Sequence, residues 1–207
     1  MTKRLFDLVF SALALFFLGP LFLAISVLIK LDSKGPIFFK QERVGKDGIR
    51  FDMYKFRKFS DDSGKHGPGL SLHDDGRLTA IGKLLDTYKL NELPQFLNVL
   101  KDDMSLVGPR PETPEFVSMY GNGFSQVLSV KQGIFGVNQM IFIQESKLFS
   151  DRDDVETFYL KEILPRKIKN DIEYVKKASV FHDIVVLGRC FWAIVVESVK
   201  RKSANTR

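Results

Sequence analysis

The sequence predicts an α+β fold that is mainly helical, with a small domain behind an N-terminal membrane helix and amphipathic helices at the membrane interface. Three observations carry this prediction. Residues 8–29 contain no charged side chain, residues 35–59 alternate turn signals with short apolar runs, and the segments that follow Asn91 and residue 160 have helical character. The predicted parts are a membrane helix over residues 1–34, a domain over 35–202 and a disordered tail over 203–207.

The composition restricts the partners that the protein can have. The chain has 207 residues, a net charge of +6 and a pI near 9.3, which favours a phosphate-rich partner: nucleic acid, an anionic membrane or a nucleotide. Composition alone does not choose among these three. The single cysteine, Cys190, excludes an internal disulfide framework and is typical of a reducing cytoplasm.

The uncharged run from Leu8 to Ile29 is long enough to cross a bilayer core of about 30 Å. Gly19 and Pro20 stand at its centre, where proline removes a backbone hydrogen bond, so we expect a break or sharp kink there. Basic residues flank the run on both sides: Lys3 and Arg4 before it, Lys30 and Lys34 after it. The positive-inside rule therefore gives no clear outside end, and both a spanning helix and a helix that returns to the same side fit the residues.

The segment 35–59 is predicted to form a hairpin or extended strands, because turn signals at Gly45 and Gly48 separate its apolar and aromatic runs. Its basic and aromatic residues resemble a nucleic-acid surface in composition. Next to a membrane helix, the same mixture suits lipid headgroups, so we expect a membrane surface and no nucleic acid.

Residues 60–72 are predicted to form a loop, because they hold three glycines and a proline. The histidines lack the close spacing of a zinc site, so no such site is expected. Asp75 and Arg77 follow the loop; they are either site residues or a local ion pair that stabilises a turn.

The chemistry concentrates between Leu90 and Pro111. Helical spacing of apolar residues predicts a short helix that begins near Asn91 and ends by Gly108, with Glu92 in its first turn. Pro109 and Pro111 stiffen the backbone around Arg110, whose planar charged group suits an anion such as phosphate. The competing interpretation is a surface helix whose arginine pairs with an ordinary carboxylate.

Several motifs occur in one order along nearly the whole chain: KRLFDLVFS, GPIFFKQERVG, FDMYKFRKF, DDGRLTAIGKLL, NELPQFLNVLKDDMSLVGPRP and DIEYVKKASVFHDIVVL. In these motifs the chain resembles the bacterial sugar transferases, which are small monotopic phosphoglycosyl transferases. The resemblance implies a re-entrant membrane helix kinked at Gly19–Pro20. It also implies a catalytic domain on the cytoplasmic face of the bacterial inner membrane and a role in surface glycan synthesis.

The resemblance further implies transfer of a phosphosugar from a nucleotide-sugar, with UDP as the expected nucleotide, to polyprenyl phosphate. The implied substrate-binding residues are Arg43, Lys55, Arg57, Arg77 and Arg110. Charge neutralisation of several phosphates favours Mg²⁺, for which Glu92, Asp75 and Asp102 are candidate ligands. A homodimer and downstream glycosyltransferases are further candidate partners.

One position departs from the family pattern. The family uses an adjacent Asp–Glu pair, whose aspartate attacks the β-phosphorus, and the aspartate position here is Asn91. An amide is a poor nucleophile, so Glu92 is expected to act as nucleophile or metal ligand, while Asn91 caps the helix or hydrogen-bonds phosphate. Two alternatives remain: direct attack by the lipid phosphate, and a non-catalytic member that binds nucleotide-sugar or assembles partner enzymes.

Overall fold

The computed structural model of the protein describes residues 2–60, 76–142, 148–149 and 154–204. The longer helices are α1 (Thr2–Asp32), α2 (Ala80–Thr87), α7 (Leu164–Lys177) and α8 (Val180–Ala204), and the short ones are α3 (Gln95–Leu100), α4 (Pro114–Tyr120), α5 (Val137–Ile141) and α6 (Val155–Phe158). The strands are β1 (Phe38–Val44), β2 (Arg50–Phe56), β3 (Ser105–Val107) and β4 (Gly133–Phe135). The described residues therefore confirm the mainly helical α+β class.

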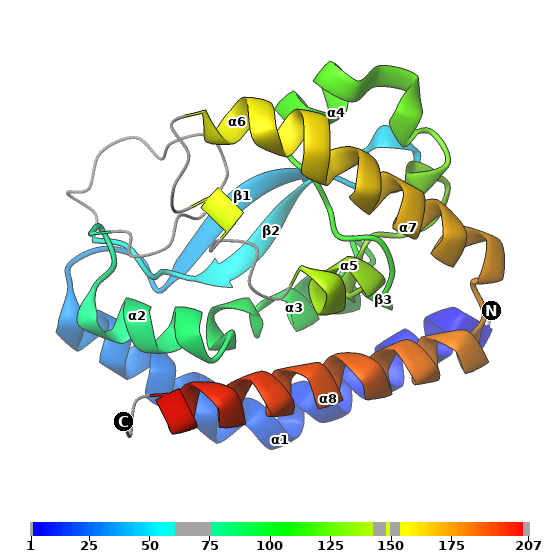
Figure 1. Ribbon diagram of the computed structural model, residues 1–207. Helices are drawn as coiled ribbons and strands as arrows, with labels where there is room; N and C mark the ends of the chain where they lie inside the picture. The colour runs from blue at the N-terminus through cyan, green and yellow to red at the C-terminus, as the bar shows by residue number, and fades with distance from the viewer. Residues whose placement is uncertain (1, 61–75, 143–147, 150–153, 205–207) are drawn as a thin grey trace.

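In Figure 1, α1 and α8 lie side by side below the domain, the β1–β2 hairpin crosses its middle, and α6 and α7 cover the top.

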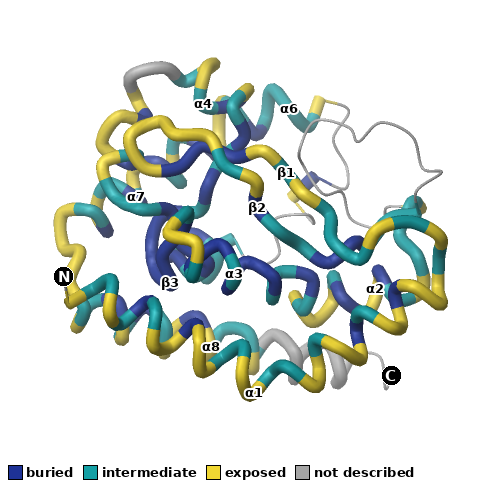
Figure 2. The backbone as a smooth tube through the Cα atoms, turned by 180° about the vertical axis from the view of Figure 1, so that it is seen from behind, coloured by how far each residue is buried: buried dark blue, intermediate teal, exposed yellow. Residues whose placement is uncertain are grey.

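Helix α1 bends at its middle but does not break there. It runs as one helix through Gly19 and Pro20, so of the predicted break or sharp kink the break is absent, and Figure 2 shows the helix bowed about its middle. A proline inside a helix removes one hydrogen bond from the ladder, and the turns on both sides keep theirs. By length and composition, α1 is the one helix in the described part of the chain that could cross a membrane.

Both halves of α1 pack against the domain. Phe6, Leu15 and Leu18 contact a core cluster centred on Met53, Val99 and Met104. Further along, Ile25 and Ile29 are buried against Phe56 of β2 and Leu85 of α2. One face of the middle of the helix is uncovered, since Phe16 and Phe17 are 76% and 72% exposed. The domain thus holds one side of the helix, and the opposite side of its middle points away from the domain.

Polar contacts fix the two ends of α1 as well. The guanidinium of Arg4 donates to the carbonyls of Val99 and Leu100, at 2.6 Å and 3.2 Å, where α3 ends. The Val99 carbonyl also accepts from the backbone N–H of Asp102. At the other end, the backbone N–H of Ile81 donates to the Asp32 carboxylate. Polar side chains thus join both ends of α1 to the backbone of neighbouring helices.

The predicted hairpin is confirmed. Strands β1 and β2 pair antiparallel from Phe38 opposite Phe56 to Val44 opposite Arg50. The turn η1 (Lys46–Gly48) takes left-handed backbone angles at Asp47 and Gly48, which closes it tightly. Alternate residues share a face of a strand, and the face with the fully buried Met53 points into the domain. The same face carries Gln41 and Arg43 on β1 and Lys55 on β2, and Arg57 follows directly after β2.

A second small sheet joins residues that are distant in sequence. Strands β3 and β4 pair in parallel, with Ser105 opposite Gly133 and Val107 opposite Phe135. A Cβ atom at position 133 would lie 2.1 Å from the backbone nitrogen of Gly108, so only glycine permits this approach. The short helical turns η3 (Gly121–Phe124), η4 (Val127–Ser129) and η6 (Tyr159–Ile163, a π-helix) complete a further cluster under α7.

Helix α8 has one face buried and one face apolar and exposed. On the buried side, Val186 and Cys190 pack into the core and Asp183 is fully buried. Asp183 accepts hydrogen bonds from Lys3 and from the Tyr174 hydroxyl. The exposed side carries large apolar residues at helical spacing, namely Phe181, Ile184, Phe191, Trp192 and Val195.

Candidate functional site

The segment predicted as one helix is divided. Lys89 takes a left-handed conformation, the turn η2 (Leu90–Glu92) follows, and α3 begins only at Gln95 after Pro94. The helix ends at Leu100, before Gly108 as predicted. Pro94 cannot donate a backbone hydrogen bond, which favours a helix that starts at the proline. The predicted start at Asn91 is therefore wrong, and Glu92 lies in the turn rather than in the first turn of the helix.

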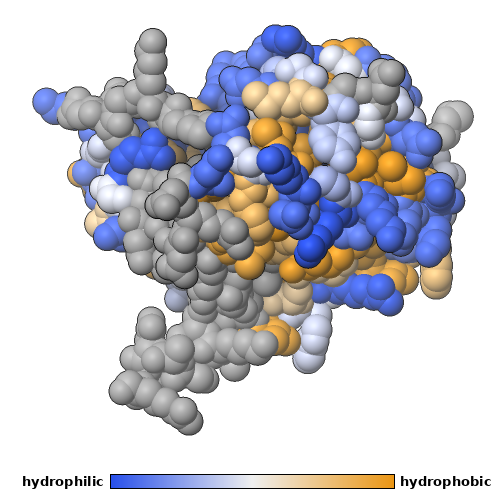
Figure 3. Space-filling model, turned by 45° about the horizontal axis from the view of Figure 1, so that its top comes forward, coloured by the Kyte–Doolittle hydropathy of each residue, from blue (hydrophilic) through white to orange (hydrophobic). Residues whose placement is uncertain are grey.

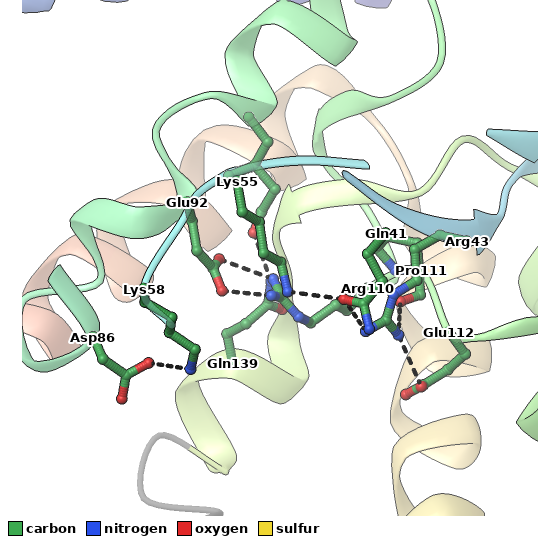
Figure 4. Close-up of polar contacts among 11 residues, drawn as sticks. Gln41, Arg43, Lys55, Lys58, Asp86, Glu92, Arg110, Pro111, Glu112 and Gln139 are labelled. Atoms are coloured by element: carbon green, nitrogen blue, oxygen red, sulfur yellow. Dashed lines mark hydrogen bonds and ion pairs between the residues drawn. The ribbon is translucent and has the colours of Figure 1, made fainter. Parts of the chain in front are cut away.

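Arg110 clamps Glu92 from across the site. Its Nη1 and Nη2 atoms lie 3.0 Å and 2.5 Å from the two carboxylate oxygens of Glu92, so the pair is bidentate (Figure 4). Burial alone would raise the pKa of the carboxyl group, but the charges of Arg110 and Lys55 outweigh it and lower the pKa of Glu92 to about 2. Glu92 is thus ionised at every physiological pH.

Two further cations stand beside this pair. The guanidinium of Arg43 donates to Gln41 Oε1 at 2.8 Å and to the Pro111 carbonyl at 3.2 Å, and it lies 3.7 Å from Glu112. Lys55 Nζ donates to the same Gln41 oxygen at 3.2 Å. Burial, with the charges of Arg43 and Arg110, holds the pKa of Lys55 well below its usual value. An added anion would relieve this crowding of positive charge.

A pocket of about 1010 Å³ opens at the hairpin. It is lined by side chains of both strands, including Phe38, Gln41 and Lys55, and by residues at the start of α4. Asn91 also lines it and is 4% exposed, and its Oδ1 atom is buried without a hydrogen-bond partner. A buried carbonyl oxygen of this kind can accept a hydrogen bond from a bound molecule.

The remaining predicted residues lie in different places. Arg57 lines the pocket, but its guanidinium donates to the carbonyls of Ser33 and Lys34 just beyond α1. Arg77 also lines the pocket and stacks over the Phe59 ring at 4.9 Å.

Of the two aspartates predicted as metal ligands, Asp102 does not lie beside Glu92. Asp102 follows the far end of α3, where it pairs with Arg4 and Lys131. Asp75 lies outside the described residues. Within the described part of the chain, no three His, Cys, Asp or Glu side chains are grouped around a common point. Glu92 is therefore the candidate ligand that stands among the site's cations.

Sequence reasoning missed Gln41. Its signal was available, because KQERV alternates along one strand and places Gln41 on the same face as Arg43. Gln41 is neutral, and its charged neighbours are the more usual phosphate-binding residues. Only the packing shows that one amide oxygen serves two cations.

The lower side of the molecule differs from the upper side. Helices α1 and α8, which carry exposed apolar side chains, both run along the lower side in Figures 1 and 2. In Figure 3, tilted to bring the top forward, hydrophilic side chains spread over the upper surface with apolar ones between them. The molecule thus has one strongly apolar side, away from its top.

Comparison with known proteins places this arrangement in context. A family described as bacterial sugar transferase matches residues 1–197. Similar proteins include a UDP-N-acetylgalactosamine-undecaprenyl-phosphate N-acetylgalactosaminephosphotransferase of Aeromonas hydrophila, 37% identical over 93% of this chain and 43% of that protein. A UDP-glucose:undecaprenyl-phosphate glucose-1-phosphate transferase of Xanthomonas campestris is 35% identical, over 89% of this chain and 37% of that protein. The exopolysaccharide production protein ExoY of Sinorhizobium fredii is 30% identical, over 93% of this chain and 85% of that protein. The chain thus spans less than half the length of the first two relatives.

Proposed function

Because the chain belongs to the bacterial sugar transferase family, we propose that it transfers a phosphosugar from a nucleotide-diphospho-sugar to a polyprenyl phosphate. The observation that carries the proposal is the group of Arg43, Lys55 and Arg110 around Glu92, with Glu112 at 3.7 Å from Arg43. Three cations beside two carboxylates leave an excess of positive charge, which suits a diphosphate. The names of the relatives support polyprenyl phosphate as acceptor and a UDP-sugar as donor.

The reaction exchanges one phosphorus–oxygen bond for another. An oxygen of the polyprenyl phosphate forms a bond to the β-phosphorus of the donor, and the bond from that phosphorus to the bridging oxygen breaks. The bridging oxygen leaves with the nucleoside monophosphate, and the product is a polyprenyl-diphospho-sugar. The cations of the site neutralise the phosphates that this attack brings together.

Among the described residues, the geometry favours direct attack over a covalent intermediate. Both carboxylate oxygens of Glu92 are engaged by Arg110, and its low pKa makes it a weak nucleophile. Asn91, which does line the pocket, carries an amide. We assign Glu92 to charge organisation and metal binding, and Asn91 to hydrogen bonding with the bound donor.

Proteins hold Mg²⁺ with one or two carboxylates together with substrate phosphates. Glu92 would be the protein ligand once the donor's phosphates replace it as the partner of Arg110. When bound, the ion would supply additional neutralisation of the phosphate charge. Arg110 would then clamp the donor's phosphates in place of Glu92.

The contacts of α1 support a re-entrant helix at the cytoplasmic face of the inner membrane. The first and last turns of α1 both bond to the same domain, so they lie on one side of the bilayer, while the exposed middle around Phe16 and Phe17 enters the lipid. The exposed apolar stripe of α8 suits the interface beside it. Such a location gives the site access to a lipid-borne acceptor.

The test is release of nucleoside monophosphate from a panel of nucleotide-sugars mixed with the protein, Mg²⁺ and polyprenyl phosphate. We expect release that requires all components and is abolished in Glu92→Gln. Arg110→Lys should lower turnover about 100-fold, because an ammonium cannot replace the bidentate fork, and should leave membrane attachment unchanged. No release with any donor would favour the non-catalytic, scaffold alternative.

Mass spectrometry of protein quenched with nucleotide-sugar alone separates the two chemical routes. Direct attack predicts no phosphosugar adduct on the natural protein. Asn91→Asp should introduce an adduct at position 91, because it places a nucleophilic carboxylate at the pocket. A phosphosugar adduct on Glu92 of the natural protein would overturn direct attack and establish the covalent route.

A further inference from the structure

We propose that Gln41 is a positioning residue: its amide oxygen gathers Arg43 and Lys55 into one anion site, and its neutrality keeps that site positive enough for a diphosphate. The inference rests on the proposed function, because it assigns a role at the same site. Gln41 is drawn between the two cations in Figure 4, and it lines the pocket.

The strand register explains how one side chain reaches both cations. Gln41 and Arg43 are two residues apart on β1, so they share the inward face. Lys55 stands opposite Phe39 on β2, which makes it the diagonal neighbour of Gln41 on that face. The single oxygen Oε1 therefore accepts from Arg43 at 2.8 Å and from Lys55 at 3.2 Å.

Two cations held this closely repel one another. Part of the positive charge is offset elsewhere, since Arg43 lies 3.7 Å from Glu112 and Arg110 pairs with Glu92. An acceptor that carries a partial negative charge can hold the cations together without neutralising them. Without it, Lys55 is expected to turn away from Arg43, because its flexible stem allows many rotamers.

The chemical identity of residue 41 then decides how well the site binds an anion. A glutamate has nearly the same shape as glutamine but would form ion pairs with both cations and compete with the ligand's phosphates. A leucine would remove the acceptor while keeping the size. The two substitutions therefore test neutrality and hydrogen bonding separately.

The experiment measures binding of UDP, and of inorganic pyrophosphate as a probe without a nucleobase, to the full chain in detergent by calorimetry. We expect Gln41→Glu to weaken both affinities at least tenfold. Gln41→Leu should weaken them about threefold to tenfold and should raise KM for the nucleotide-sugar more than it lowers kcat. Gln126→Glu makes the same chemical change at an exposed glutamine outside the pocket and should leave both affinities unchanged.

A double-mutant cycle tests whether Gln41 acts through Lys55. The effect of Gln41→Leu on pyrophosphate binding should shrink in a Lys55→Met background, because the cation that Gln41 positions is gone. A merely structural role would change the thermal midpoint and leave the cycle additive. Additivity with an unchanged KM would overturn the inference.

The outcomes distinguish this inference from the proposed function. If the natural protein binds neither UDP nor pyrophosphate, the proposed function fails. If the natural protein binds both and Gln41→Glu binds them equally well, the proposed function stands and the role of Gln41 is overturned.

Discussion

At the scale of single residues, the site is defined by which charges are matched and which are not. Glu92 and Arg110 satisfy each other through two hydrogen bonds, whereas Lys55 has only the amide of Gln41 among its described acceptors. The pKa of Lys55 is lowered by burial and by the neighbouring arginines. Unmatched positive charge of this kind costs stability in the free protein and is relieved when an anionic ligand binds.

A buried acid outside the site gives a prediction about stability. Burial, together with the charge of Glu112, raises the pKa of Asp171 from 3.8 to about 7. Between pH 3.8 and about 7 the folded protein still holds the Asp171 proton, whereas the unfolded chain has already released it. The free energy of unfolding therefore falls as pH rises through that window. Asp171→Asn should remove the loss and stabilise the protein at pH 8 by on the order of 2–4 kcal/mol.

Thermal unfolding at pH 4 and pH 8 in one detergent checks this prediction. The Asp171→Asn variant should match the natural protein at pH 4 and melt at a higher temperature at pH 8. Equal midpoints at pH 8 would show that Asp171 is not held protonated by its surroundings.

The motifs of the sequence predicted which charged residues bind substrate, and that role stays a prediction. The structure places three of them, Arg43, Lys55 and Arg110, around Glu92. Arg57 instead holds the backbone beyond α1 as well as lining the pocket, and Asp102 pairs with Arg4 of α1. A motif identifies candidate site residues, but the partner of each side chain depends on contacts between segments that are distant in sequence.

At the scale of elements, local patterns predicted the hairpin and the long helices, and they failed for short pieces. Turn signals around Gly45 and Gly48 identified β1 and β2 because such turns are local. Strands β3 and β4 have three residues each, and they pair although they are distant in sequence. No local sequence pattern therefore predicts them. The helix expected at Asn91 begins later, at Gln95, because Pro94 sets its start.

The β3–β4 pair leads to a prediction about two glycines. In Gly133→Ala the new Cβ would lie 2.1 Å from Gly108 N and 2.7 Å from Val107 C, so the two strands would have to separate. We expect a loss of about 2–4 kcal/mol, measured as a lower thermal midpoint.

Gly188→Ala is the matched control for this substitution. It adds the same atom inside α8, where no heavy atom lies within 4 Å, and should stabilise the helix by about 0.5–1 kcal/mol. Similar midpoints for the two variants would contradict the close approach of β3 and β4.

At the scale of the whole molecule, the position of α1 determines the topology. Single cysteines introduced by Thr2→Cys and Lys34→Cys, in a Cys190→Ala background, should both react with a membrane-impermeant reagent only from the cytoplasmic side. The reason is that both ends of α1 bond to one domain. Glu173→Cys, on the exposed surface of α7, provides the cytoplasmic reference. Labelling of the two ends from opposite sides would establish a spanning helix instead.

The Lys3–Asp183 contact has a consequence for how the protein is made. It joins side chains 180 positions apart, so α1 is synthesised long before its partner in α8. At about 5–20 residues per second, roughly 10–40 s separate the two on the ribosome. During that interval Lys3 has no buried carboxylate, whereas other parts of α1 can already pack against β2, α2 and α3. Helix α8 therefore completes the contacts of α1, and a chain released before α8 leaves Lys3 without its partner, a defect that cellular quality control can recognise.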